Sequence, residues 1–441
     1  MSGNEAGRTC VVGAGPAGLA MMRALGRHGL EFDCFERHED VGGIWDQANP
    51  GSPVYDSAHF ISSRSLSGFH GYPMPEHLPD YPDHRQVLTY LRDFADAYGL
   101  RERVTTSTAV ERAEPEPGGG WRATLAGGEV RGYDQLVCAN GTTWDPSSPE
   151  LEGDFAGQIL HSGAYRSTAT FAGKRALVVG AGNSGVDIAC DAAQSAEAAW
   201  ISMRRGYHVV PKHIFGTPAG VFAESGPELP MWAAQRILPA LIRLQTGNQQ
   251  RLGLPKPDHR LFETHPILNS QILHHLSHGD IGVKPDVRRL DGEHVEFADG
   301  TRERVDVVVL ATGYRYSIPY LDQELIDWKG GRPQLYLHLF SPRREDLYGI
   351  GFTEGDGGAY ALFDEMADLI ANAIATSSAD AGGRRERLER TRRGPPPDVS
   401  GGVRHVPSDR HASYLHLPAY RKAAAALRSD MGWLEPSWTS P

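Results

Sequence analysis

The apolar positions near the N-terminus form two short runs separated by a helical stretch. TCVVG (residues 9–13) predicts a buried strand, and EFDCFER (31–37) predicts a second one. Between them, LAMMRALGRHG (19–29) has a helical pattern that stops near Gly29, a residue suited to end a helix. The order of strand, glycine-rich turn, helix and strand predicts an α/β unit.

The same order returns about 167 residues later. ALVVG (176–180) predicts a strand, VDIACDAA (186–193) a helix and AAWISMRRG (198–206) another strand. A further apolar run, VDVVVLATGY (305–314), predicts a strand that leads the chain back to the first unit. The chain therefore contains two α/β units of one kind.

Each unit carries a G-x-G-x-x-G turn between its first strand and its helix. The glycines are Gly13, Gly15 and Gly18 in the first turn, and Gly180, Gly182 and Gly185 in the second. The first glycine permits the tight turn, the second lets the backbone approach a pyrophosphate, and the third lets helix and strand pack closely. An ordinary glycine-rich turn of another α/β unit is the alternative, but the strand and helix around each turn favour dinucleotide binding.

The two units differ at the end of their second strands. The first has Glu36, whose carboxylate suits ribose hydroxyls. The equivalent spacing in the second unit falls on Met203, beside Arg204 and Arg205. A guanidinium attracts a 2′-phosphate that a carboxylate would repel, so we expect FAD at the first turn and NADPH at the second. If the arginines only form a solvated strand end, NADH remains open.

Composition narrows the class of protein. The chain has 441 residues, 40% hydrophobic and 22% charged, a net charge of -11 and a pI near 5.9. Length alone predicts two or three domains of about 150 residues. An acidic protein is a poor partner for nucleic acid or for an anionic membrane.

The cysteines and histidines suggest neither disulfide chemistry nor a metal site. Cys10, Cys34, Cys138 and Cys190 form no C-x-x-C pair and sit in apolar surroundings, so we expect buried free thiols. His274, His275 and His278 lack further ligands at metal spacing, so we expect no metal. With a polar N-terminus and no apolar run near the roughly 20 residues of a membrane span, a cytoplasmic protein is expected.

Between the two turns lies FAGQILHSGAY, which has neither helical nor strand periodicity. It contains Phe155, Gly157, His161 and Tyr165 in the pattern F-x-G-x-x-x-H-x-x-x-Y. VGGIW (41–45), VCANG (137–141) and LATGY (310–314) also occur, and the motifs follow one another in a characteristic order. In these motifs and their order, the chain resembles the flavin-containing monooxygenases, which are class B flavoprotein monooxygenases. The resemblance runs from about residue 8 to about residue 365.

The resemblance implies an α/β fold with two Rossmann-like dinucleotide-binding domains, the NADPH domain inserted into the FAD domain. We expect the FAD domain at 1–160 and 305–441 and the NADPH domain at 161–304. It also implies a homodimer, and a linker role for the F-x-G-x-x-x-H-x-x-x-Y motif in orienting the NADPH domain. A purely structural histidine at His161 is the alternative.

The implied activity is oxygenation of a small molecule by O2. NADPH reduces FAD, the reduced flavin forms a hydroperoxide, and a nucleophilic nitrogen or sulfur takes one oxygen atom. The motif closes with Tyr165 and Arg166, where Baeyer–Villiger monooxygenases typically have Trp and then Pro or Asp, which favours nitrogen or sulfur oxygenation. Baeyer–Villiger oxidation of a ketone is the alternative, and a flavin disulfide reductase is disfavoured because no cysteine pair is present.

The cofactor contacts follow from the motifs. Those expected from the glycine turns, the strand ends and the motifs between them are Gly13, Gly15, Pro16, Ala17, Gly18, Glu36, Arg37, Gly43, Ile44, Trp45, Ser62, Arg64, Val110, Ala139, Asp356, Gly180, Gly182, Asn183, Ser184, Gly185, Ser202, Arg204, Arg205, Thr312 and Gly313. Asp356 belongs to TEGDGG (353–358), which an ordinary turn explains equally well.

One position departs from the family pattern. The family usually has Y-x-S-x-x-x-N-x-S-K near the flavin, and the chain reads YDSAHFISSR from Tyr55, with Ile61 at the asparagine position and Arg64 at the lysine. Isoleucine offers no hydrogen bond, although His59, Ser62 or Ser63 could substitute. We assign no catalytic residue and expect a shorter-lived hydroperoxide than is usual in the family. An uncoupled NADPH oxidase or a redox-sensing flavoprotein therefore stays open.

Overall fold

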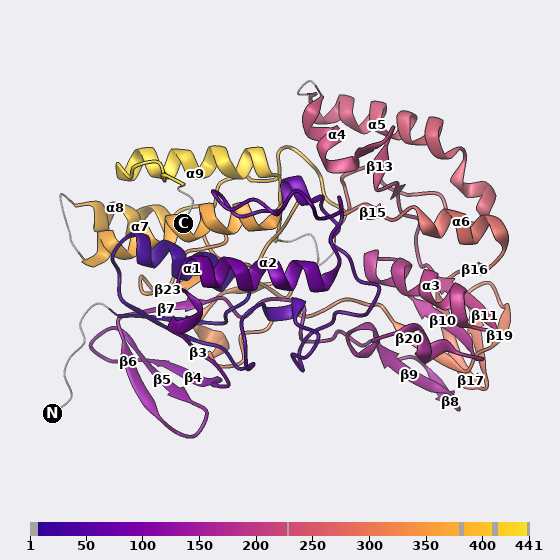
Figure 1. Cartoon of the computed structure of the whole chain (residues 1–441), viewed down its shortest axis with the longest axis horizontal. Coiled ribbons are helices and arrows are strands. Elements are labelled where there is room, and N and C mark those ends of the chain that lie inside the picture. Colours follow the sequence, from indigo (N-terminus) through magenta and orange to yellow (C-terminus); the bar gives the residue numbers. More distant parts are fainter. Residues whose placement is uncertain (1–7, 227–228, 379–382, 408–412, 439–441) are drawn as a thin grey trace.

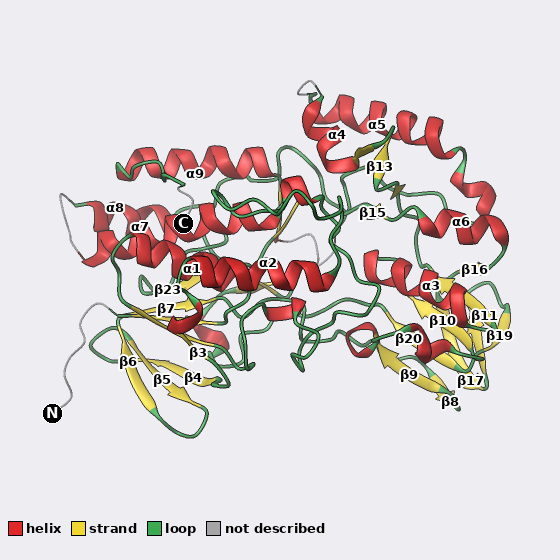
Figure 2. Cartoon of the chain, in the orientation of Figure 1, coloured by secondary structure: helices red, strands yellow, loops and turns green. Residues whose placement is uncertain are grey.

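The computed structural model describes residues 8–226, 229–378, 383–407 and 413–438. Two lobes lie side by side, and each contains its own parallel sheet (Figure 1). The N-terminal strands and the C-terminal helices share one lobe, while the middle of the chain forms the other. Secondary structure is mixed α/β throughout (Figure 2).

The first sheet has the strand order β23-β7-β1-β2-β3, and all neighbouring strands are parallel. Its strands are β1 (Thr9–Val12), β2 (Phe32–Phe35), β3 (Val104–Thr105), β7 (Gln135–Cys138) and β23 (Leu347–Gly349). Helix α1 (Pro16–Arg27) packs against α7 (Ala359–Ser378). The strands read as continuous apolar runs because a parallel sheet covered by other elements is buried on both faces.

The second sheet repeats this design with the order β16-β11-β10-β20-β9, again all parallel. Its strands are β9 (Gln158–His161), β10 (Arg175–Val179), β11 (Ala198–Ser202), β16 (Ile281–Lys284) and β20 (Val307–Leu310), and α3 (Asn183–Ser195) follows β10. This sheet begins before and ends after the range 161–304 expected from the sequence, because the expected return strand β20 pairs with β10 and β9.

Smaller elements surround the sheets. An antiparallel sheet of β4 (Val110–Pro115), β5 (Trp121–Leu125) and β6 (Val130–Tyr133) adjoins the first lobe, and β8 (Gly153–Phe155), β17 (Val287–Gly292), β18 (His294–Phe297) and β19 (Arg302–Arg304) adjoin the second. The other helices are α2 (His84–Ala97), α4 (Ala219–Ser225), α5 (Met231–Thr246), α6 (Gln271–His278), α8 (Arg384–Arg392) and α9 (Leu417–Met431). Two-residue strands are β12 (Val209–Val210), β13 (His213–Ile214), β14 (Thr217–Pro218), β15 (Ile267–Leu268), β21 (Trp328–Lys329), β22 (Arg332–Pro333), β24 (Glu354–Gly355) and β25 (Tyr414–Leu415).

The chain passes between the lobes twice, after β7 and after β20, and the two connections are fastened to each other. Ser147 N–H donates to Gly313 O at 2.9 Å, and Thr312 Oγ1 donates to Ser147 O at 2.6 Å. Farther along, Arg315 N–H donates to Asp145 O at 2.9 Å. Thr312 and Gly313 of the LATGY motif therefore lie where the chain changes lobes.

The cysteines are buried and free, as expected. Burial raises the pKa of each of the four thiols, so none is a reactive thiolate. Within the described ranges, no helix is both long and apolar enough to cross a membrane. The same ranges contain no group of three or more His, Cys, Asp or Glu placed to hold a metal ion.

Candidate cofactor sites

The first glycine turn connects β1 to α1 with almost no room for side chains. Gly13 has φ +107°, and a Cβ there would lie 2.6 Å from Ala139 O. A Cβ at Gly18 would lie 1.9 Å from Gly13 O, so α1 starts directly against the turn. The N-cap residue is Gly15, and no side chain caps the helix. The first N–H groups of α1 therefore remain available to an anion such as a pyrophosphate.

Glu36 lies at the end of β2 against this turn. It is buried, and its carboxylate accepts hydrogen bonds from Ala14 N–H at 2.8 Å and from His38 N–H at 2.9 Å. The carboxylate oxygens keep lone pairs for ribose hydroxyls. Thr108 N–H donates to Glu36 O at 2.9 Å, two residues before β4 begins at Val110. These contacts hold Glu36 against the first turn and the start of β4 beside Glu36, and the cofactor role of Val110 stays a prediction.

Arg37 contacts a residue that the sequence did not indicate. Its guanidinium lies 4.8 Å from the centre of the Trp144 ring. A cation over an indole face is an attractive arrangement. Trp144 belongs to the first connection between the lobes, and only the tertiary structure brings it beside Arg37.

The VGGIW loop lies across the first turn. Gly42 N–H donates to Ala14 O at 3.1 Å, and a Cβ at Gly43 would lie 2.9 Å from Gly15 Cα. Gly43, Ile44 and Trp45 form a short 3-10 turn, η1 (Gly43–Trp45). The loop therefore approaches the turn backbone to backbone, as a cofactor cradle requires.

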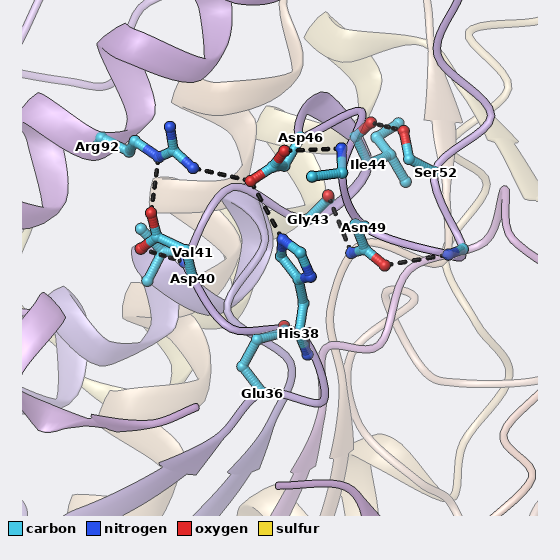
Figure 3. Close-up of polar contacts among 12 residues, drawn as sticks. Glu36, His38, Asp40, Val41, Gly43, Ile44, Asp46, Asn49, Ser52 and Arg92 are labelled. Carbon is cyan, nitrogen blue, oxygen red and sulfur yellow. Dashed lines mark hydrogen bonds and ion pairs between the residues drawn. The ribbon is translucent and has the colours of Figure 1, made fainter. Parts of the chain in front are cut away.

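A partly buried polar network holds this loop (Figure 3). Asp46 Oδ2 accepts hydrogen bonds from His38 Nε2 at 3.1 Å and from Arg92 Nη2 at 2.8 Å. Arg92 Nε also pairs with Asp40 Oδ2 at 2.8 Å, which ties the loop to α2. Sequence reasoning missed these residues. Asp46, directly after Trp45, was the only signal, and nothing in the sequence pointed to Arg92.

The loop itself is closed by two further side chains. Asn49 Nδ2 donates to Gly43 O at 3.2 Å, and Ser52 Oγ donates to Ile44 O at 2.5 Å (Figure 3). Both bonds satisfy carbonyl groups that a 3-10 turn of three residues leaves free. The loop is thus held at a fixed distance from the glycine turn.

The segment that departs from the family pattern lies beyond this loop. Ile61 is 38% exposed, and the Ser62 hydroxyl is hydrogen-bonded to the Ser67 hydroxyl at 2.8 Å. Arg64 opens the 3-10 turn η2 (Arg64–Leu66), and its Nη1 donates to Pro75 O at 3.4 Å. Asp356 Oδ1 accepts from Leu417 N–H at 2.9 Å, at the start of α9. These contacts leave the cofactor roles of Ser62, Arg64 and Asp356 as predictions.

The second glycine turn repeats the first in detail. Gly180 has φ +104°, with a Cβ position 2.5 Å from Ala311 O, and a Cβ at Gly185 would lie 2.1 Å from Gly180 O. Helix α3 begins after the N-cap Gly182 without a side-chain cap. Its first N–H groups are therefore available to a second pyrophosphate.

Three expected residues gather at the second turn. Asn183 Oδ1 accepts from Leu268 N–H at 2.9 Å, and Ser202 O accepts from Gly180 N–H at 3.0 Å. Ser184 is exposed at the start of α3. The buried Ser202 hydroxyl, however, donates to Pro285 O at 2.8 Å and is engaged within the protein.

The two arginines after β11 have different surroundings. Arg204 is exposed and has no ion pair within the described part of the chain. Arg205 Nη2 pairs with Asp258 Oδ2 at 2.8 Å. The preceding Met203 is buried. Of the two guanidiniums, Arg204 is therefore the one free to meet a 2′-phosphate.

The motif between the turns holds the lobe connections together. His161 accepts from Gly163 N–H at Nδ1, at 3.0 Å, so its Nε2 carries the proton and donates to Gly313 O at 3.0 Å. Burial lowers the pKa of His161, which keeps the ring neutral. A Cβ at Gly157 would lie 2.4 Å from Asp306 O. Phe155 packs against the second lobe's core, and the linker role of the motif stays a prediction.

Tyr165 ends the motif in the core beside α3. Its ring is completely buried and stacks on Phe171 with centroids 5.2 Å apart. Its hydroxyl donates to Asp191 Oδ2 at 2.9 Å. The sequence indicated Tyr165 but not its partner Asp191.

Comparison with known proteins agrees with this geometry. The profile of the flavin-binding monooxygenase-like family matches residues 6–372. Probable indole-3-pyruvate monooxygenase YUCCA9 from Arabidopsis thaliana is 32% identical over 377 residues, 82% of this chain and 88% of that protein. Human flavin-containing monooxygenase 5 is 32% identical over 362 residues, 77% of this chain and 67% of that protein. The closed crystal structure of cyclohexanone monooxygenase superposes with a TM-score of 0.71 at 17% identity, covering 98% of this chain and 99% of that one.

The chain belongs to the flavin-binding monooxygenase-like family. Enzymes of this family are monooxygenases that use FAD, NADPH and O2, so the predicted enzyme class and cofactors are confirmed at the level of the family. The parallel sheets confirm the α/β class.

Proposed function

We propose that this protein is an NADPH-dependent FAD monooxygenase that transfers one oxygen atom of O2 to a nucleophilic nitrogen or sulfur of a small molecule. The observation that carries the proposal is the pair of matching glycine turns with different groups at the ends of their second strands. Glu36 stands at the first turn and the exposed Arg204 at the second. Two nucleotides of different type in one chain favour electron transfer between them.

The residues at the first turn fit FAD. The uncapped start of α1 would face the pyrophosphate, Glu36 would accept from ribose hydroxyls, and Gly43 and Ala139 would leave room for the backbone to approach. At the second turn, α3 would face the NADPH pyrophosphate. Together the bound cofactors supply hydride transfer from NADPH to flavin and the reduction of O2.

We also propose that the second lobe is an NADPH domain inserted into an FAD domain. Support comes from the single exit after β7 and the single return after β20, with each glycine turn in its own sheet. The predicted boundaries at 160 and 305 would then move outward, to before β8 and after β20. The buried thiols favour a reducing compartment such as the cytoplasm.

The protein would shield the reaction from water with aromatic side chains. Trp45 stacks on Phe60 with centroids 5.0 Å apart, and Phe60 contacts Tyr360 edge-on at 5.5 Å. Phe60 directly precedes Ile61 in the chain. Because isoleucine cannot donate a hydrogen bond, we propose that coupling of NADPH oxidation to product is incomplete.

The test measures NADPH consumption, oxygenated product and H2O2 together, with amines, thioethers and ketones as substrates. Product heavier by one oxygen from an amine or thioether supports the proposal, and product from a ketone alone refutes it. Ile61→Asn should increase the product formed per NADPH. NADPH oxidation that gives only H2O2 with every substrate would instead indicate an oxidase or redox sensor.

A carbonyl substrate is the second candidate. It is favoured by the relative named as an indole-3-pyruvate monooxygenase, since indole-3-pyruvate is a 2-oxo acid. The same assay with a 2-oxo acid tests it. Catalase must be present, because released H2O2 also oxidises 2-oxo acids without the enzyme. Turnover that catalase abolishes would reject this candidate.

A further inference from the structure

A segment of the first lobe is packed into the core of the second. Residues 52–58 follow the VGGIW loop, yet Val54, Tyr55 and Ala58 are buried in the cluster that surrounds α3. In Figure 1 this early part of the chain runs between α2 and the lobe that carries α3. Ala58 N–H donates to Tyr55 O at 2.9 Å, which closes a turn in the segment. We call residues 52–58 the crossing segment.

Two hydrogen bonds join the crossing segment to α3. Tyr55 OH donates to Asp187 Oδ2 at 3.1 Å, and Ser57 Oγ donates to Asp191 Oδ2 at 2.6 Å. Asp187 and Asp191 are four residues apart, so they lie on one face of α3, about 6 Å along its axis. The two bonds therefore fix the direction of the helix axis as well as its position.

The same carboxylates collect bonds from elsewhere in the second lobe. Tyr165 OH donates to the Asp191 oxygen that Ser57 uses, and Asn269 Nδ2 donates to Asp187 Oδ1 at 2.6 Å. Burial raises the pKa of both carboxyl groups. Removing a carboxyl group from water costs free energy unless hydrogen-bond donors face it. Here the donors come from both lobes, so the lobes must be held in place relative to each other.

The backbone after the motif fastens the crossing segment from the side. Asp56 N–H donates to Arg166 O at 2.8 Å, and Arg166 Nη2 donates to Ser52 O at 3.0 Å. Besides the two covalent connections, the crossing segment is therefore one of several non-covalent attachments between the lobes, which also include the ion pair of His213 with Asp80 at 2.9 Å and the hydrogen bond from Val406 N–H to Glu263 O at 2.9 Å. The crossing segment bonds directly to α3, the helix that starts at the second glycine turn.

We propose that Tyr55 and Ser57 are positioning residues that set the orientation of α3, and with it the bound nicotinamide, for hydride transfer to the flavin. The inference rests on the proposed function, since it concerns transfer between the two cofactors. Tyr55 and Ser57 act through Asp187 and Asp191. Hydride transfer depends steeply on geometry, and a misplacement of about 1 Å can cost about a hundredfold in rate.

The experiment uses the full-length holoenzyme with Tyr55→Phe and Ser57→Ala combined, which removes both crossing hydroxyls and little volume. The limiting rate of anaerobic flavin reduction by NADPH should fall about tenfold to a hundredfold. The Kd of NADPH, the FAD content and the thermal midpoint should stay close to wild type. If the double variant yields no flavin-loaded protein, Ser57→Ala alone is measured and should slow reduction by about threefold or more.

Three variants serve as controls. Ser195→Ala removes a hydrogen bond from α3 to Thr168 O, within the second lobe, and should leave the reduction rate unchanged. Asp191→Ala removes the acceptor and should slow flavin reduction. Asp191→Asn keeps an oxygen that accepts from both Ser57 and Tyr165, and should recover most of the rate that Asp191→Ala loses.

The outcomes are distinct. Reduction within twofold of wild type in the double variant overturns the inference, and so does an equal loss in Ser195→Ala. A slow rate explained by weaker NADPH binding or by lost FAD would make the role structural, which also overturns it. Wild-type flavin that dithionite reduces and NADPH does not would refute the proposed function itself.

Discussion

Replacing Gly18 by alanine is expected to weaken FAD binding strongly while leaving the sheet intact. The added Cβ would lie 1.9 Å from Gly13 O, which is roughly 1.5 Å inside ordinary contact. Gly13 O is a backbone atom and the alanine Cβ is fixed by the backbone, so no side-chain rotation can relieve the overlap. The start of α1 must move away from the turn by about the same amount.

The size of the effect follows from that movement. A hydrogen bond of about 2.9 Å lengthened by about 1.5 Å is no longer a hydrogen bond. Bonds to a charged group contribute about 1.5–3 kcal/mol each, so losing two from the pyrophosphate weakens binding by about 3–6 kcal/mol. Affinity for FAD should fall by about two to four orders of magnitude.

A matched change at the other turn separates the two sites. A Cβ at Gly185 would lie 2.1 Å from Gly180 O, so Gly185→Ala should weaken NADPH binding by a similar factor and leave FAD bound. Gly132→Ala is the control, because a Cβ there has open space. The FAD-to-protein ratio of purified protein and a titration of the flavin spectrum with NADPH measure both effects. Stoichiometric FAD in Gly18→Ala would refute the assignment, as would loss of FAD but not NADPH in Gly185→Ala.

Three further outcomes are expected from single sites. Arg204→Ala should raise the KM for NADPH about tenfold to a hundredfold in steady-state kinetics and leave the KM for NADH unchanged. Equal effects on the two KM values would contradict a contact with the 2′-phosphate. The pKa of His161 is lowered, so its contribution to stability is present above its ordinary pKa near 6.5 and is lost as pH falls through the folded value. His161→Ala should remove that part of the pH dependence of the unfolding free energy measured in urea. An unchanged slope of that free energy against pH would contradict the prediction. Burial raises the pKa of Asp364 to about 6 although Arg23 pairs with it at 2.5 Å, so its stability contribution is full below the unfolded pKa near 3.8 and is lost as pH rises through about 6. Arg23→Met should therefore destabilise by about 3–5 kcal/mol at pH 8 and by less at pH 5, which equal losses at the two pH values would disprove.

Local patterns predicted the elements on which the site is built. TCVVG and ALVVG became β1 and β10, and the helix expected to stop near Gly29 ends at Arg27, with Gly29 at φ +65°. The apolar runs were readable because parallel strands bury both faces. The return strand was also predicted, but its place in the second sheet was not, since pairing depends on contacts far apart in sequence.

The site divides in the same way. The glycines, Glu36 and the motif residues follow from short spacings. The structure places the glycines of the two turns and Glu36 at the turns, His161 at a lobe connection, and Phe155 and Tyr165 in the core of the second lobe. His38, Asp46 and Arg92 were missed because their network joins a loop to a helix 46 residues away. No local pattern marks an arginine on α2 as a partner of that loop.

The amino-acid sequence by itself determined that this protein would contain two dinucleotide turns and that they would differ in charge at the second strand. Both properties depend on residues within about 25 positions of each other, where backbone geometry and charge act directly. Only the tertiary structure decided how the lobes are held, because Tyr55 and Asp187 are 132 residues apart. Such a bond depends on the packing of both lobes at once, since the donors to each α3 carboxylate come from segments that the sequence does not place beside it.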